Sequence, residues 1–259
     1  MLEDIVRRIK GLGGSRGDYV VNAVDTLDTP VHSLLDIGCS YGWTLDALTG
    51  KALELVGVDT DEGALQQAKN NYTHIKFIHQ NASTLPFESN TFDVAVLSEV
   101  IEHVGDENKQ LVIDEAHRVL RTGGLFILTC PHTGLLAWVD PLDFKRRFPR
   151  IYRVYMRLTN YEPHTPIEVG HKHLSLKEIE SLFNNRFKIK HVRYCGFFEP
   201  LLTWILAVDS RVKLLPSTWH SGLNRLRAWE SGVPYGKSLA YNIRVTSFKK
   251  KNPQVKPRC

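Results

Sequence analysis

The sequence predicts an α/β fold: a Rossmann-like, doubly wound and mostly parallel sheet of about seven strands, with inserted cap segments. Through residue 131, short apolar runs alternate with amphipathic stretches. This alternation is typical of βαβ units around a sheet that is buried on both faces. The 259 residues, 42% of them hydrophobic and 24% charged, suffice for one large domain with a real core.

In the first 130 residues the expected strands are short apolar runs, and amphipathic stretches lie between them. The strands are expected at 34–37, 55–59, 75–79, 92–97, 125–130, 187–194 and 241–248. Helices are expected at 43–48, 62–71 and 109–120, with stops at 70–71 and 122–124. A further helix is expected to begin after Ser175 and to run to about Asn184, because Glu178 stands three residues after Ser175, as in a capping box.

The alternation lapses after Pro131, and this indicates insertions. The expected segments are an N-terminal helical segment (1–30), the core (31–131), a basic aromatic insertion acting as a lid or cap (132–174), the C-terminal part of the core (175–249) with a second insertion near 197–238, and a basic, disordered tail (250–259).

The charge is divided between the two halves of the chain. Residues 1–140 hold 10 Lys and Arg against 20 Asp and Glu, a net of −10. Residues 141–259 hold the remaining 23 basic and 8 acidic residues, a net of +15. This division indicates that the basic half contacts something anionic. Solvated surface charge without a partner is the alternative.

Cysteine usage and hydropathy indicate the compartment. The four cysteines show no paired spacing, so neither a zinc site nor a disulfide framework is expected. The N-terminus has acids early and lacks the apolar run of a signal peptide. The longest apolar stretch, 197–208, is shorter than the ~20 residues that span a bilayer. We expect a cytoplasmic protein.

The strongest functional signal is a glycine turn at 38–42, directly after an apolar strand that ends in Asp36. Glycine suits this place because a Cβ would block the close approach of a ligand to the backbone. A second acid, Asp59, closes the next strand, where an acid can accept hydrogen bonds from both ribose hydroxyls of an adenosine.

Two kinds of cofactor fit these features. A dinucleotide site requires G-x-G-x-x-G, whereas this turn reads Gly38-x-Ser40-x-Gly42. Asp36 would repel a diphosphate and would attract a sulfonium or an ammonium. The spacing therefore disfavours NAD(P). A glycine turn that binds nothing is the third interpretation.

Five ordered motifs within residues 33–131 resemble those of class I S-adenosylmethionine (SAM)-dependent methyltransferases. They are 34–42, 57–59, 80–82, 92–98 and the turn at 120–124. The run 98–104 is similar to that of ubiquinone-biosynthesis-type, or methyltransferase type 11, small-molecule enzymes. The resemblance becomes weak after Pro131.

The resemblance implies a SAM site. It implies that Asp36, Gly38, Ser40 and Gly42 surround the methionine part of SAM, with Cys39 in the same turn, and that Asp59 holds the ribose hydroxyls. Thr60, Asn81 and Ala82 are expected beside the adenine, and Ser98 at the carboxyl end of the fourth strand. Many members have glycine where Ser40 stands, so serine is expected to be tolerable only with a negative φ. Many have aspartate where Asn81 stands. The Asn81 carbonyl can accept the same bond from the adenine amino group, and the Ala82 N–H can donate to the ring.

Methyl transfer depends mainly on positioning and desolvation, but an oxygen or amine acceptor can require a base, usually histidine. His132 is the preferred candidate because it follows the fifth strand, and His171 is the second. His103 is expected to be structural. No metal site is expected, because His171 and His173 have no acidic or cysteine partner nearby.

The segment 144–158 predicts a basic amphipathic helix. Its arginines fall within an arc of roughly 120°, beside an aromatic and aliphatic face. They are Arg147, Arg150, Arg153 and Arg157. Such a helix suits an anionic membrane surface, with the protein peripheral there, or a phosphate-bearing acceptor. A lid helix with solvated arginines is the alternative. Nucleic acid is the least favoured partner, because no RNA-binding module is apparent.

We therefore expect a methyltransferase that moves a methyl group from SAM to an oxygen of a small-molecule or lipid-linked acceptor and releases S-adenosylhomocysteine. Nitrogen and carbon are less favoured. One alternative is a non-catalytic protein of the same fold that binds an anionic partner through its basic half. Intact Asp36, Gly38 and Asp59 argue against it. The other alternative is an NAD(P)-dependent oxidoreductase.

Overall fold

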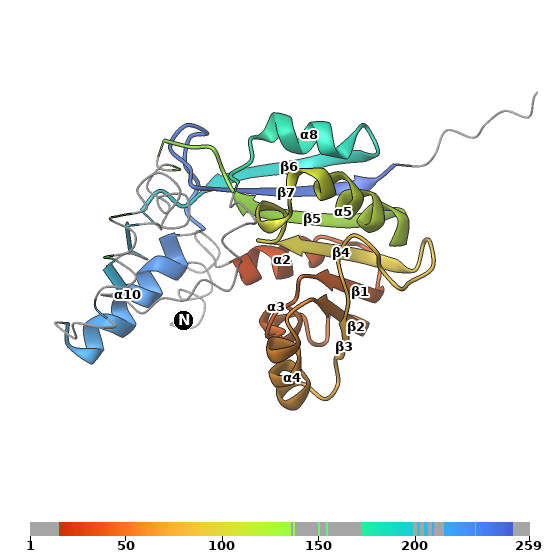
Figure 1. Ribbon diagram of the computed structural model, residues 1–259, viewed down its shortest axis with the longest axis horizontal. Coiled ribbons are helices and arrows are strands. Elements are labelled where there is room, and N and C mark those ends of the chain that lie inside the picture. Colours follow the sequence, from red (N-terminus) through yellow and green to blue (C-terminus); the bar gives the residue numbers. More distant parts are fainter. Residues whose placement is uncertain are drawn as a thin grey trace, which may run out of the picture.

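A computed structural model describes residues 16–135, 137, 150, 154, 172–198, 201–202, 205–206, 209, 215–230 and 232–250. Its centre is a seven-stranded sheet with the order β3-β2-β1-β4-β5-β7-β6 (Figure 1). Strand β7 is antiparallel to both of its neighbours, and the other pairs are parallel. The predicted doubly wound, mostly parallel sheet is confirmed.

All seven predicted strands are present. They are β1 (Val31–Ile37), β2 (Ala52–Asp59), β3 (Lys76–His79), β4 (Phe92–Ser98), β5 (Leu120–Pro131), β6 (Phe187–Cys195) and β7 (Asn242–Lys249). Strand β5 begins earlier than predicted and contains a bulge, because Phe92 pairs with Leu120 while Val94 pairs with Leu125. Gly123, with φ +80°, lies in this bulge, where the sequence predicted a turn.

The described elements also include six α-helices and one short 3₁₀ helix. The α-helices are α2 (Arg16–Val24), α3 (Trp43–Ala47), α4 (Glu62–Asn71), α5 (Asp106–Val119), α8 (Leu176–Phe183) and α10 (Ser217–Glu230), and the 3₁₀ helix is η1 (Ile101–His103). The predicted capping box of α8 is confirmed: the Ser175 N–H donates to Glu178 Oε2 at 2.8 Å, and the Glu178 N–H donates to Ser175 Oγ at 3.3 Å. Asn184, with φ 42°, ends this helix.

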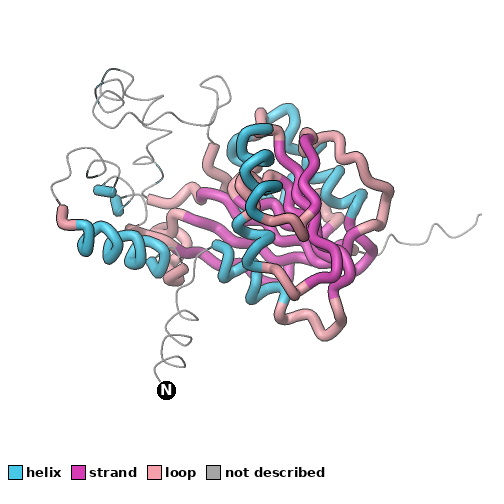
Figure 2. The backbone as a smooth tube through the Cα atoms, turned by 90° about the horizontal axis from the view of Figure 1, so that it is seen from below, coloured by secondary structure: helices cyan, strands magenta, loops and turns pink. Residues whose placement is uncertain are grey.

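The helices cover both faces of the sheet (Figure 2). Leu34 and Leu35 are both fully buried, but successive residues of a strand face opposite sides. Leu34 packs in a cluster with α2, α3 and α4, and Leu35 packs in a second cluster with α5 and α8. Tyr19 Oη of α2 also hydrogen-bonds Thr246 Oγ1 of β7 at 2.7 Å. Within the described part of the chain, no helix has the length and apolar character to cross a membrane.

Candidate active site

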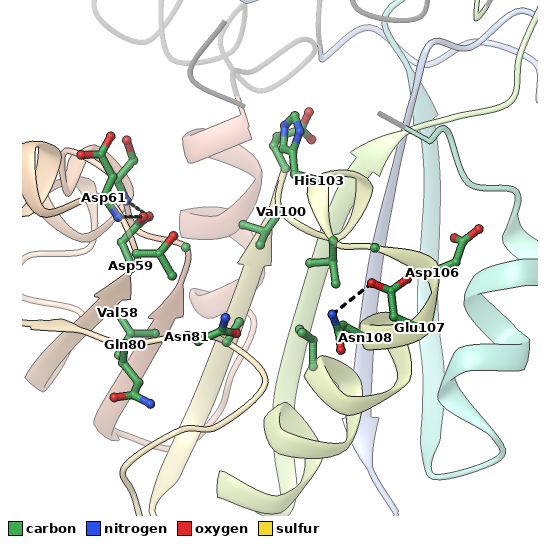
Figure 3. Close-up of a pocket in the computed structure, with 18 of the residues that line it drawn as sticks. Val58, Asp59, Asp61, Gln80, Asn81, Val100, His103, Asp106, Glu107 and Asn108 are labelled. Atoms are coloured by element: carbon green, nitrogen blue, oxygen red, sulfur yellow. Dashed lines mark hydrogen bonds between the residues drawn. The ribbon is translucent and has the colours of Figure 1, made fainter. Parts of the chain in front are cut away.

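The candidate site lies where the strand order reverses. From β1 the chain runs outward to β2 and β3 and then returns to β4 on the other side of β1. The loops that leave β1 and β4 therefore diverge, and a crevice opens beyond the carboxyl ends of these strands. A pocket of about 830 Å³ lies there (Figure 3). It is lined by Gly38, Ser40, Tyr41, Val58, Asp59, Thr60, Asp61, Gln80, Asn81, Ala82, Glu99, Val100, His103, Val104, Gly105, Asp106, Glu107, Asn108 and Val112.

The glycine turn is tied to the neighbouring strand. The N–H groups of Gly38 and Cys39 donate to the Val58 carbonyl at 2.8 and 3.0 Å. Gly38 has a φ of +81°, and a Cβ built on it would lie 2.2 Å from Val100 Cγ2. Glycine is required here for backbone conformation and for packing against the loop after β4.

The expectation that Ser40 has a negative φ is wrong, because its φ is +46°. A hydrogen bond accompanies the left-handed conformation: the Ser40 N–H donates to Asp59 Oδ2 at 2.7 Å. A charge-assisted bond of this kind is stronger than a neutral one and offsets part of the steric cost of a left-handed serine.

Replacing Ser40 with glycine should raise the free energy of unfolding by ~0.5–1 kcal/mol, because the Cβ strain disappears while the backbone N–H remains. Urea denaturation of the protein without ligand measures this change. Ser40→Ala is the matched control, since it keeps the Cβ and should give no gain. Equal stability of the two variants would contradict a strained Ser40.

Asp59 is held rigidly at the end of β2. Its Oδ2 accepts the Ser40 N–H, and its Oδ1 accepts the Asp61 N–H at 2.9 Å. Each carboxylate oxygen has a second lone pair. Asp59 can therefore still accept hydroxyl donors from the pocket that it lines (Figure 3). Thr60 and Asp61 follow it along the same wall.

Asp36 lies outside the pocket lining and is only 2% exposed. Burial raises its pKa to about 7, and the nearby charge of Asp59 shifts it in the same direction. Three other predicted site residues, Cys39, Gly42 and Ser98, also do not line the pocket. Burial raises the pKa of the Cys39 thiol well above its usual range, and the Ser98 hydroxyl bonds Thr129 Oγ1 at 2.8 Å.

The raised pKa of Asp36 predicts a pH dependence of stability. Between about pH 4 and pH 7 the folded protein holds a proton that the unfolded chain has released. The contribution of Asp36 to stability should therefore be greatest at low pH and be lost as pH rises through about 7, with a slope of at most ~1.4 kcal/mol per pH unit.

Urea denaturation at several pH values between 5 and 8 measures this slope in the protein without ligand. Asp36→Asn should flatten it, because the amide does not titrate. Asp46→Asn changes an exposed aspartate on α3 and should keep the slope. Parallel curves for wild type and Asp36→Asn would contradict the prediction.

Asn81 lines the pocket, but its side-chain oxygen is already engaged. Asn81 Oδ1 accepts both the N–H and the hydroxyl of Ser83 at 2.9 Å. The side-chain carbonyl of Asn81, which was expected to accept the adenine amino group, thus already accepts two hydrogen bonds. The side-chain amide nitrogen of Asn81 can still donate to a ligand. Ala82 lines the same wall, as the prediction required.

The opposite wall comes from the segment between β4 and α5 and from the first turn of α5. The segment contributes Glu99 and His103, and the helix contributes Asp106 and Glu107. His103, Asp106 and Glu107 are labelled in Figure 3. With Asp59 and Asp61, five carboxylates line the pocket, and no lysine or arginine is among the described residues of its lining. Among these five, Asp106 is paired with Lys109 at 2.7 Å, which keeps its pKa low. The arrangement attracts a cation and repels a diphosphate.

Three candidate histidines lie in different surroundings. His132 is 1% exposed, is absent from the pocket lining and bonds the Leu174 carbonyl through Nδ1 at 3.0 Å. Burial lowers its pKa. His171 lies outside the described residues. His103, which the sequence analysis took as structural, lines the pocket with its side chain 30% exposed.

The sequence reasoning therefore missed His103 and the acids of its wall. The signal was present in the run 98–107, which carries two acids and a histidine in the motif after β4 and then Asp106 and Glu107 at the start of a helix. Acids in a first helical turn are ordinary features of a helix, and the sequence alone does not show that the start of α5 lies at the pocket.

Comparison with known proteins identifies the class of this site. Residues 35–128 match the family model described as "Methyltransferase domain". A "Probable S-adenosylmethionine-dependent methyltransferase" of Mycolicibacterium smegmatis is 32% identical over 101 residues, which cover 39% of this chain and 38% of that protein. The ubiquinone/menaquinone biosynthesis C-methyltransferase of Campylobacter jejuni is 32% identical over 102 residues, 37% of this chain and 43% of that protein. The chain thus spans about two fifths of the length of these curated relatives.

Solved structures show the same fold over most of the chain. The YcgJ protein of Bacillus subtilis superposes with a TM-score of 0.56 at 16% identity and covers 91% of this chain and 98% of its own. Geranyl diphosphate methyltransferase in complex with SAM gives a TM-score of 0.55 at 14% identity, over 90% of this chain and 84% of its own. Residues 35–128 therefore resemble a methyltransferase domain, and the solved structures show the same fold over most of the chain.

Proposed function

We propose that the chain transfers a methyl group from SAM to an oxygen atom of a small-molecule or lipid-linked acceptor. The observation that supports SAM most directly is the pocket itself, whose described lining has five carboxylates and no basic side chain. SAM carries a sulfonium and an ammonium, which such a pocket attracts. NAD(P) carries a diphosphate, which the same carboxylates would repel.

The residues of the pocket fit the parts of this cofactor. Asp59 would accept the ribose hydroxyls, the turn at Gly38 and Ser40 would hold the methionine part, and Asn81 and Ala82 would contact the adenine. When bound, SAM supplies a methyl group on a good leaving group. The protein then has to position the acceptor, exclude water and remove a proton.

A hydroxyl acceptor has to lose its proton during transfer, and histidine is the usual base near neutral pH. We infer that His103 takes this role, because it is the histidine that lines the pocket among the described residues. His132 remains a weaker candidate, since it is buried and bonded to a backbone carbonyl.

Calorimetric titration of the protein with S-adenosylhomocysteine and with NADH separates the two cofactors. We expect binding of the first and none of the second at millimolar concentration. Binding of NADH alone would refute the proposal. Incubation with methyl-labelled SAM and either total lipid extract or small-molecule extract then tests transfer. A cofactor that binds without any label transfer would favour the non-catalytic alternative.

The predicted basic helix at 144–158 falls mostly outside the described residues. Of its four arginines, Arg150 is described and exposed, and Arg147, Arg153 and Arg157 are not described. Its contact with an anionic membrane surface therefore remains a proposal. The net charge of +15 in residues 141–259 supports it.

A further inference from the structure

Helix α10 carries large apolar side chains on its exposed surface. Trp219, Leu226 and Trp229 are 65%, 45% and 41% exposed. At ~100° per residue they fall within an arc of roughly 80°, so they form one stripe along the helix. The helix extends away from the sheet in both views, and its stripe is not part of either core cluster (Figures 1 and 2).

A second exposed apolar group precedes α10. Phe198, Leu201 and Ile205 are 47%, 50% and 39% exposed, and the short helical pieces of this stretch lie beside α10 in both views (Figures 1 and 2). We call these six side chains the apolar patch. They are half of the twelve exposed large hydrophobic residues of the described chain, although they come from a stretch of only 32 residues. This concentration is more than scattered surface hydrophobicity.

A buried carboxylate holds the two parts of the patch together. Glu230, the last residue of α10, is 3% exposed. Its Oε1 accepts the N–H groups of Phe197 and Phe198 at 2.5 and 2.7 Å. These hydrogen bonds hold Phe198 of the patch against the end of α10.

The charge around the patch has one sign. Both described acids of residues 198–237, Asp209 and Glu230, are buried and accept backbone N–H groups. Of the described charged side chains there, Arg225 and Lys237 are exposed and Arg227 is half-exposed. Among the described residues, the acids of this stretch therefore lie inside the protein, and the charged side chains that border the apolar patch are cations.

We propose that the apolar patch docks on an anionic lipid bilayer, with α10 lying in the plane of the interface. Tryptophan is favoured at the boundary of headgroups and acyl chains, and arginine extends its charge to the headgroups from an apolar helix face. The charge also argues against a second copy of this chain, because a symmetric contact of two α10 helices would bring Arg225 and Arg227 of both copies together.

Co-sedimentation with lipid vesicles tests the proposal. The full chain is mixed with vesicles of phosphatidylcholine alone or of phosphatidylcholine with about a third phosphatidylglycerol. We expect binding to the anionic vesicles at low salt, with a blue shift of tryptophan fluorescence, and loss of binding near 1 M salt, where the Debye length is ~3 Å. Arg225→Gln with Arg227→Gln should weaken binding about 30-fold, at ~1 kcal/mol for each arginine near the surface.

Trp219→Ser, Leu226→Ser and Trp229→Ser together should weaken binding at least as much. The matched control is Leu53→Ser with Leu111→Ser, which alters exposed leucines outside the patch and should bind like wild type. Replacing the four arginines of 144–158 with glutamine distinguishes the contribution of that segment to vesicle binding from the contribution of α10. If α10 carries the binding, this variant should still bind anionic vesicles. Vesicle binding is measured without methyl transfer, so a failure of the proposed methyltransferase function would leave this test of the apolar patch valid.

Three outcomes would overturn the proposal. The first is a wild-type protein that does not bind anionic vesicles at low salt. The second is a triple serine variant that binds as wild type does. The third is a dimer in sedimentation velocity that the triple variant dissociates, without vesicle binding, because the occupant would then be a second copy.

Discussion

Replacement of Asp59 with alanine should weaken the binding of S-adenosylhomocysteine by ~1–3 kcal/mol. Asp59 stands at the end of β2 as the proposed acceptor for both ribose hydroxyls. The same carboxylate accepts the N–H groups of Ser40 and Asp61, so its loss also releases two parts of the pocket wall. Isothermal titration calorimetry measures the change.

Two variants make this result interpretable. Asp59→Asn keeps one oxygen acceptor and should lose less affinity than the alanine variant. Asp46→Ala changes an exposed aspartate outside the pocket and should bind like wild type. Wild-type affinity of Asp59→Ala would show that the ligand does not contact this end of β2.

Replacement of His103 with alanine should lower kcat by ~10²–10⁴ if His103 takes the proton of the acceptor hydroxyl. The affinity for S-adenosylhomocysteine should stay within about threefold, because the ribose and methionine contacts remain in place. Transfer of label from methyl-labelled SAM to the extract that accepts it measures the rate. The pH profile of kcat should lose its rising limb in the variant.

His32→Ala is the matched control, since His32 is exposed and lies at the opposite end of β1 from the pocket. It should leave both rate and pH profile unchanged. A His103→Ala enzyme with the rate and pH profile of wild type would remove His103 from the mechanism. The next candidate would then be His132.

The fold was predictable because its signals are local. The first five strands contain apolar runs bounded by polar residues or turns, and the capping box of Ser175 and Glu178 marks the start of α8. The glycine turn and Asp59 were predictable for the same reason, since a strand, an acid and a tight turn are adjacent in the chain.

The remaining features of the site depend on contacts that the sequence does not show. Ser40 was expected to avoid a positive φ, but a carboxylate 19 residues away accepts its N–H. Asn81 was expected to offer its oxygen to a ligand, but the side chain of Ser83 and its backbone N–H take that oxygen. The sequence also does not show that Asp106 and Glu107, at the start of α5, lie at the pocket.

The carboxylates that line the pocket also bear on how the reaction ends. Methyl transfer converts a positively charged sulfonium into a neutral thioether, so the cofactor loses its charge while the carboxylates of the pocket lining keep theirs. The attraction that favours the entry of SAM is therefore weaker for S-adenosylhomocysteine. Loss of the sulfonium charge during methyl transfer thus weakens the electrostatic attraction of the product to the pocket. The electrostatic contribution therefore favours the exchange of S-adenosylhomocysteine for a new molecule of SAM.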